Sequence, residues 1–150
     1  MLDVYRAKGK VMTNTKIFRD HHDELLSIAT KVSAFLSEEK LKESASEVRG
    51  LLSKLFAKLG IHLAMEDKAL YPKLLGSSDE KIRTMAKQFM DEMGGIGEAV
   101  GNYKKKWPTH FSIEQSPNDF IKETEGLFEA LGNRIEKENS QLYKMVDELD

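Results

Sequence analysis

The sequence predicts an all-α protein, an up-down-up-down bundle of four antiparallel helices. Its apolar residues recur at intervals of three and four rather than two, which is the period of an amphipathic helix. Only three prolines and ten glycines interrupt this pattern in 150 residues. Four long periodic segments remain between the breaks, and such segments joined by moderate loops pack as a bundle.

The first two expected helices form one half of the chain. The first follows Thr13–Thr15, three residues that favour helix N-caps, and continues to Leu36. The second runs from about Ser44 to Tyr71, because its leucines stay in helical phase over this stretch and Pro72 lies near its end.

The other two expected helices form the second half. A polar break at Gly76–Asp79 supplies the N-cap of the third helix, which stops near Trp107–Pro108. The fourth begins at Ser116–Pro117, a capping residue followed by proline at the first helical position, and continues to the C-terminus. We expect residues 1–150 to form one domain, with residues 1–14 as an N-terminal extension.

An internal repeat relates the two halves. Residues 55–71 read LFAKLGIHLAMEDKALY and residues 127–143 read LFEALGNRIEKENSQLY, with seven of 17 positions identical at an offset of 72. An offset of 71 aligns the first and third helices and places Met93 at the position of His22. The bundle is therefore predicted to be a duplicated helical hairpin.

Composition and charge exclude several classes of function. With 23 basic and 25 acidic residues the net charge is -2, which provides no field for nucleic acid or an anionic membrane. Because cysteine is absent, a metal would need His, Asp or Glu ligands. No stretch is long and apolar enough for a membrane span and no signal peptide is recognised, so we expect a cytoplasmic protein. The lack of residue patterns typical of hydrolases or cofactor-dependent enzymes favours binding over turnover of an organic substrate.

Four ionisable residues fall on helix faces that should point into the bundle. His62 and Glu66 are four residues apart and share the apolar face of the second helix. His22 follows the apolar stripe of the first helix, and Glu138 holds the repeat position of Glu66 in the fourth. A buried His–Glu pair alone is most simply a hydrogen bond completed by tyrosine and water. Together, however, these residues from three helices can converge as a carboxylate-rich metal site.

Two segments of the first half form a motif. Residues 20–26 read DHHDELL, and residues 62–72 read HLAMEDKALYP. They resemble the pattern of the hemerythrin-like (HHE cation-binding) proteins, a His on one helix and His-x-x-x-Glu with an aromatic-proline ending on the next. The resemblance covers about residues 15–147 and implies a hemerythrin-like fold with two non-haem irons bridged by carboxylates. It also implies a role in dioxygen binding, oxygen or nitric-oxide sensing, iron handling or stress protection.

The second half departs from this family pattern at two positions. Met93 stands where a His of the third helix is expected, and Arg134 stands where a His should precede Glu138. Methionine is a poor ligand for iron and arginine cannot be a ligand, so we expect one metal ion rather than two. The expected partners are iron and a small diatomic ligand. The metal ligands that remain are His22, His62, Glu66 and Glu138.

A second interpretation needs no metal. Arg134 is always protonated, so it could lie between Glu66 and Glu138 and replace the charge of a cation. The pocket would then be a buried salt-bridge network. The chain would be a helical regulatory or interaction module that retained the bundle after losing the metal site.

Some residues near these motifs have more than one interpretation. His21 could replace His22 as a ligand, although the register with the leucines that follow favours His22. Four glycines within residues 94–101 indicate either close helix packing around the Arg134 side chain or room for a small ligand. His110 and the run Lys104–Lys106 are interpreted as surface residues.

Overall fold

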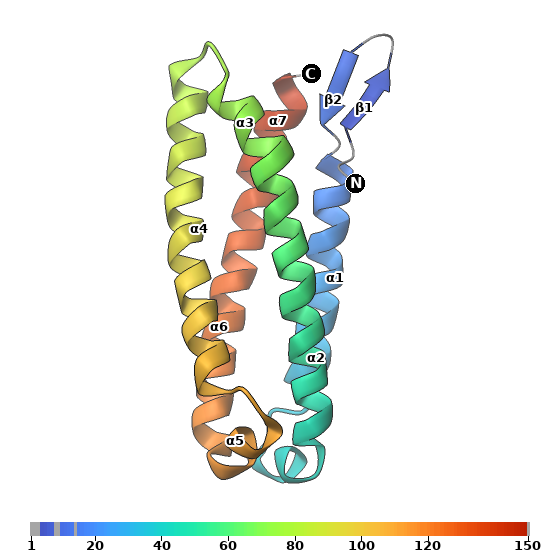
Figure 1. The fold of residues 1–150 in the computed structure, drawn as a ribbon, viewed down its shortest axis with the longest axis vertical. Helices are drawn as coiled ribbons and strands as arrows, with labels where there is room; N and C mark the ends of the chain where they lie inside the picture. The colour runs from blue at the N-terminus through green and yellow to red at the C-terminus, as the bar shows by residue number, and fades with distance from the viewer. Residues whose placement is uncertain (1–3, 8–9, 14, 150) are drawn as a thin grey trace.

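The computed structural model describes residues 4–7, 10–13 and 15–149. The helical elements are α1 (Thr15–Ser33), α2 (Glu38–Met65), η1 (Glu66–Leu70), α3 (Tyr71–Leu75), α4 (Glu80–Lys106), α5 (His110–Gln115), α6 (Pro117–Lys137), η2 (Glu138–Leu142) and α7 (Tyr143–Leu149). The long helices α1, α2, α4 and α6 run side by side, and α5 lies across the end where α4 leads to α6 (Figure 1). Helix α2 continues through the π-helical turn η1 into α3, and α6 continues through η2 into α7.

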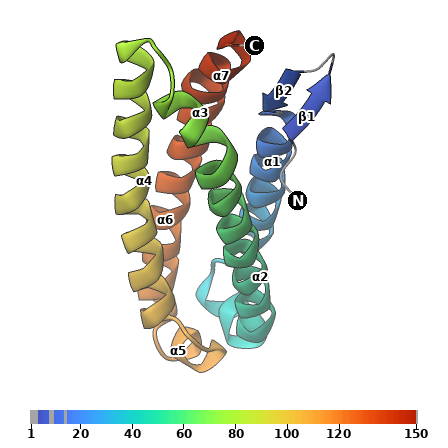
Figure 2. The same ribbon diagram turned by 45° about the horizontal axis from the view of Figure 1, so that its top comes forward.

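Residues 15–149 are helical apart from short connections, which confirms the all-α prediction for this part of the chain. The sequence interpretation did not include α5 or two short strands, β1 (Val4–Ala7) and β2 (Lys10–Thr13). The strands pair antiparallel with Val4 opposite Thr13, beside the end of the molecule where α7 ends (Figure 2). The proposed capping residue Asn14 lies outside the described residues. Among the described helices, none has the length and apolar character of a membrane span.

Helix α4 starts where the sequence predicted, whereas helix α2 does not. Asp79 caps α4 as predicted, since its side chain accepts a hydrogen bond from the backbone N–H of Lys81. Helix α2 begins earlier than predicted, because Ser37 accepts a hydrogen bond from the backbone N–H of Lys40 and two glutamates occupy the first turn. Ser44, where the start was predicted, has non-helical backbone angles inside α2.

Apolar side chains fill the interior in two clusters. One includes Leu52, Trp107 and Phe120, and the other includes Phe18 and Leu70. His22, His62 and Glu138 each fall in the sequence between a member of one cluster and a member of the other. The polar site is therefore enclosed by apolar packing on both sides.

Candidate metal centre

Each of the two buried glutamates begins a π-helical turn. Glu66 starts η1 and Glu138 starts η2, so the repeat extends to the backbone conformation. In each turn the backbone N–H of the tyrosine five residues later donates to the glutamate carbonyl, Tyr71 to Glu66 and Tyr143 to Glu138. A π turn brings residues five apart onto one face, so each glutamate and its tyrosine both point inward.

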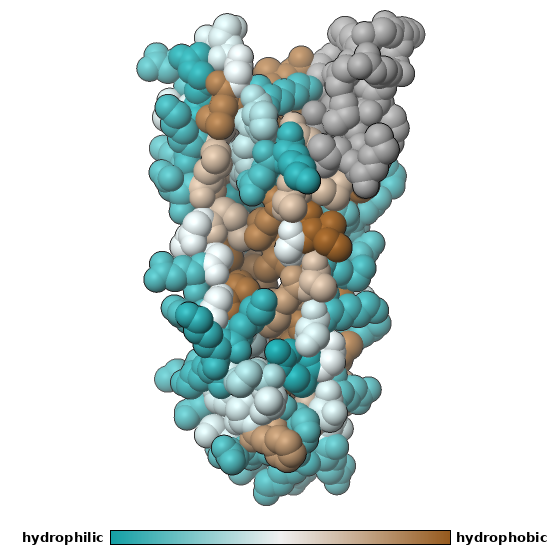
Figure 3. Space-filling view, viewed as in Figure 1, coloured by the Kyte–Doolittle hydropathy of each residue, from teal (hydrophilic) through white to brown (hydrophobic). Residues whose placement is uncertain are grey.

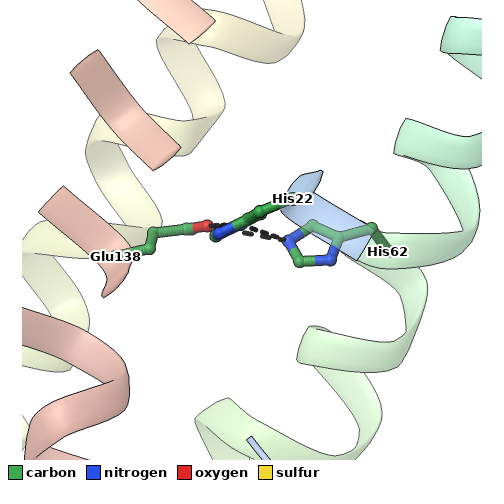
Figure 4. A group of neighbouring side chains, drawn as sticks. All are labelled: His22, His62 and Glu138. Carbon is green, nitrogen blue, oxygen red and sulfur yellow. Dashed lines mark hydrogen bonds and ion pairs between the residues drawn. The ribbon is translucent and has the colours of Figure 1, made fainter. Parts of the chain in front are cut away.

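Three of the four predicted residues come together at the centre of the molecule. His22 Nε2 lies 3.2 Å from His62 Nε2 and 2.8 Å from Glu138 Oε1, and His62 Nε2 lies 3.6 Å from Glu138 Oε1. All three side chains are buried, and they point toward one another from α1, α2 and the start of η2 (Figure 4). We call these residues the His–His–Glu group; their ligand atoms lie within 4.8 Å of one another.

The outer nitrogens of both imidazoles also have partners. His22 Nδ1 lies 2.8 Å from Asn139 Oδ1, an oxygen that accepts hydrogen bonds, so Nδ1 can donate to it and Nε2, which faces Glu138, is the nitrogen that a metal ion would bind. His62 Nδ1 lies 3.2 Å from Nδ1 of His21, which is half-buried. The predicted choice of His22 over His21 agrees with this placement, because His22 faces the group and His21 contacts it from outside.

The fourth predicted residue, Glu66, is buried beside the group. Its Oε2 accepts a hydrogen bond of 2.6 Å from the Tyr143 hydroxyl and lies 3.4 Å from His62 Nε2. Its Oε1 is buried and has no hydrogen-bond partner among the described residues. A buried carboxylate oxygen without a partner is strongly unfavourable unless a cation or proton satisfies it.

The residues of this site therefore fit a cation. Burial lowers the pKa of His62, but hydrogen bonds to the carboxylates of Glu138 and Glu66 outweigh it and raise that pKa to about 9. For the carboxyl group of Glu138 burial has the opposite effect and raises the pKa. Hydrogen bonds from His22 and His62 and the charge of Arg134 outweigh it and lower that pKa to about 2. Two carboxylates and two imidazole nitrogens are a ligand set suited to iron, manganese or zinc.

In metal-free protein, these pKa values predict a loss of stability at alkaline pH. His62 has a folded-state pKa of about 9 against an ordinary value of 6.5, so protonated His62 stabilises the fold below about pH 6.5. That stabilisation, on the order of a few kcal/mol, should disappear as the pH rises through 9. Urea unfolding of chelated protein at several pH values between 6 and 10 measures it. Metal-loaded protein should instead lose stability on acidification, because protons displace the metal from nitrogen. If the stability of chelated protein does not change between pH 6 and 10, the raised pKa of His62 is contradicted.

Arg134 points into the interior, as the repeat predicts. Its side chain is buried, and Nε donates to Glu138 Oε2 at 3.0 Å rather than to Glu66. Nη2 donates to the Tyr71 hydroxyl at 3.1 Å and to the Phe89 carbonyl at 2.9 Å, and Nη1 donates to Glu92 at 3.4 Å. Several acceptors thus hold the guanidinium in place. Its positive charge lies next to the His–His–Glu group, on the Oε2 side of Glu138.

Met93 lines a small cavity next to the group. The cavity has a volume of about 30 Å³ and is bounded by His22, His62, Glu138 and Arg134, with a lining that is otherwise almost entirely apolar. This space accommodates a molecule of the size of water or a diatomic ligand. On the outer surface, apolar side chains gather at mid-height between α2 and α4 (Figure 3), where Leu63, Met90, Met93 and Gly94 line a groove.

The glycines of α4 are not sites of close helix packing, so that interpretation of residues 94–101 is wrong. A Cβ atom added to Gly94, Gly95, Gly97 or Gly101 would meet no atom within 4 Å. The reason is that no residue of α4 between Phe89 and Tyr103 is fully buried. This stretch of α4 is the thinly packed wall of the bundle beside the cavity.

Replacing Gly95 with alanine should stabilise the protein by about 1 kcal/mol, because alanine favours the helix and nothing lies in the way of the added methyl group. Thermal unfolding of the variant measures the gain. Gly76→Ala is the matched control, since its Cβ would lie 3.2 Å from the Pro72 carbonyl oxygen. Destabilisation by Gly95→Ala would show that this position is packed in solution.

The surface residues lie where the sequence predicted. His110 is half-exposed in α5 and pairs with Glu114, and Lys104–Lys106 are exposed at the end of α4. Sequence reasoning did not assign Tyr143 or Asn139 to the site. The Leu-Tyr end shared by the two repeats was the signal for Tyr143, whereas Asn139 has no counterpart in the motif.

Comparison with known proteins accounts for this arrangement. The hemerythrin HHE cation binding domain matches residues 13–146, which include both halves of the repeat and all four predicted site residues. Searches among curated proteins and among solved structures find no match. The chain belongs to the family of hemerythrin HHE cation-binding domains.

Proposed function

We propose that the protein binds one iron ion at the site formed by the predicted residues His22, His62, Glu66 and Glu138. The observation that supports this most directly is the convergence of three ligand atoms of the His–His–Glu group within 4.8 Å. Asn139 occupies Nδ1 of His22 and leaves Nε2 directed at the group, as partners of metal-binding histidines do. In this proposal the long helices form the up-down-up-down bundle predicted from the sequence, with the cation midway along it.

The stoichiometry of one follows from the second half-site. Arg134 holds Glu138 Oε2, and Met93 offers only a thioether to the cavity. A second cation would have to displace the guanidinium from its carboxylate and would meet like-charge repulsion. Arg134 therefore provides the charge that a second metal would otherwise bring.

A role in sensing or handling small molecules or iron is supported by the cavity. Its size suits a diatomic ligand, and its apolar lining disfavours ions and larger polar substrates. We therefore propose oxygen or nitric-oxide sensing, iron handling or stress protection, and a binding role rather than turnover of an organic substrate.

A metal-free regulatory or interaction module is the second candidate, and the buried ion pair between Arg134 and Glu138 favours it. In this case a proton on His62 and the guanidinium would neutralise the two glutamates. The bundle would then be stable without metal.

Metal analysis of protein purified without chelator separates these candidates. We expect about one iron per chain and a lower melting temperature after chelation, because a cation that binds only the folded state stabilises it. Two irons per chain would contradict the role given to Arg134. No metal uptake, with a melting temperature indifferent to chelator, would support the metal-free module.

A further inference from the structure

Tyr143 brings its hydroxyl into the His–His–Glu group. The side chain is fully buried and follows directly after η2. Its ring stacks on the His22 imidazole, with centroids 5.2 Å apart and ring planes at 26°. This packing places the hydroxyl oxygen, Oη, 3.2 Å from His22 Nε2, 3.3 Å from His62 Nε2 and 3.3 Å from Glu138 Oε1.

Oη and the three ligand atoms of the group stand at the corners of a tetrahedron. The edges within the group measure 3.2, 2.8 and 3.6 Å, and the edges to Oη measure 3.2, 3.3 and 3.3 Å. A tetrahedral metal ion with bonds of about 2.0–2.1 Å separates its ligand atoms by about 3.3–3.4 Å. Two nitrogens and two oxygens thus already have the spacing of a four-coordinate site.

Glu66 contacts this tetrahedron at two corners, at the Tyr143 hydroxyl and, at 3.4 Å, at His62 Nε2. The Tyr143 hydroxyl donates to Glu66 Oε2 at 2.6 Å, its shortest contact, so its proton already points at that carboxylate. A phenol must lose its proton to bind a metal as phenolate. Glu66 is the nearest acceptor for that proton, and its other oxygen has no partner among the described residues.

We propose that Tyr143 is the fourth ligand of the cation and that Glu66 accepts its proton; this rests on the proposed function. On binding, the O–H bond of Tyr143 breaks, Oη binds the cation, and the proton moves to Glu66 Oε2. No oxidant or further reactant is needed. Glu66 then acts as the acceptor of the Tyr143 proton and does not bind the cation itself, although the sequence predicted it as a ligand. The hard phenolate oxygen favours iron(III) among the metals this site suits.

The repeat supplies a matched control. Tyr71 is the counterpart of Tyr143, is also buried, and accepts a hydrogen bond from Arg134 rather than contacting the His–His–Glu group. Tyr71→Phe therefore removes an equivalent hydroxyl from the other half of the molecule. Tyr103, whose hydroxyl bonds to Thr124 in the apolar cluster near α5, is a second control.

The experiment loads the full chain with Fe³⁺ and, separately, with Co²⁺. A phenolate bound to Fe³⁺ gives a visible charge-transfer band and enhanced tyrosine ring modes in resonance Raman spectra. We expect both in the natural protein and in the Tyr71→Phe and Tyr103→Phe variants, but not in Tyr143→Phe. Titration should show that Tyr143→Phe binds Co²⁺ at least about tenfold more weakly than Tyr71→Phe. The reason is that removing a ligand should reduce metal affinity more than removing a residue that only contacts the groups around the ligands.

The possible results separate this inference from the proposed function. Metal uptake without a tyrosinate spectrum, or equal Co²⁺ affinity of Tyr143→Phe and Tyr71→Phe, would overturn Tyr143 as a ligand and leave metal binding intact. No uptake of either metal would overturn both. Should Tyr143→Phe fail to fold, persistence of the tyrosinate spectrum in a Tyr71→Phe/Tyr103→Phe double variant supports the inference, and its loss overturns it.

Discussion

Replacing Arg134 with methionine is expected to destabilise the metal-free protein by about 3–5 kcal/mol. The substitution keeps a long apolar side chain near Phe89 but removes the only buried arginine or lysine that contacts Glu138 among the described residues. It also leaves the Phe89 carbonyl and the Tyr71 hydroxyl without this donor. Chemical denaturation of chelated protein measures the loss.

Bound metal should reduce this loss, because a cation at the His–His–Glu group also neutralises Glu138 and binds only the folded state. Lys137→Met is the control: Lys137 is partly exposed and pairs with Glu92, so its removal should cost no more than about 1 kcal/mol. If the two variants lose similar stability in chelated protein, the buried guanidinium does not have the role assigned to it.

Combining Met93→His with Arg134→His should raise metal uptake from one ion per chain to two. Both side chains line the cavity beside Glu138, so two imidazoles there would face a carboxylate freed from the guanidinium. The substitutions restore the histidines expected from the family pattern. Elemental analysis of purified protein provides the count.

The matched control is Met93→Leu with Arg134→Met, which removes the same side chains without adding ligands. It should not bind more metal than the natural protein. A folded double-histidine variant with unchanged uptake would indicate that α4 holds residue 93 too far from Glu138. The thinly packed glycine segment around residues 94–101 should help α4 to adjust.

The sequence by itself determined the four long helices and the inward direction of the ionisable residues. Helical phase is a local property, so the apolar stripes already oriented His22, His62 and Glu66. The repeat extended this to the second half and predicted the buried position of Arg134, which the structure confirms.

Local patterns failed where packing between helices mattered. The glycines of α4 look the same in the sequence whether a neighbouring helix packs closely against them or not. Only the structure showed that no atom lies close to them. The early start of α2 was a different kind of error, because the Ser37 cap is a local signal that the prediction did not use.

Only the tertiary structure decided which atoms meet. Phase places a side chain on a face to within a fraction of a turn, whereas a metal site depends on separations of a few tenths of an ångström. The π turn that begins at Glu138 directs Tyr143 toward the His–His–Glu group, and stacking on His22 fixes the position of its hydroxyl. Glu138 thereby contacts both histidines directly, whereas Glu66 contacts only His62 directly and reaches His22 through Tyr143. These contacts between helices depend on how the helices pack.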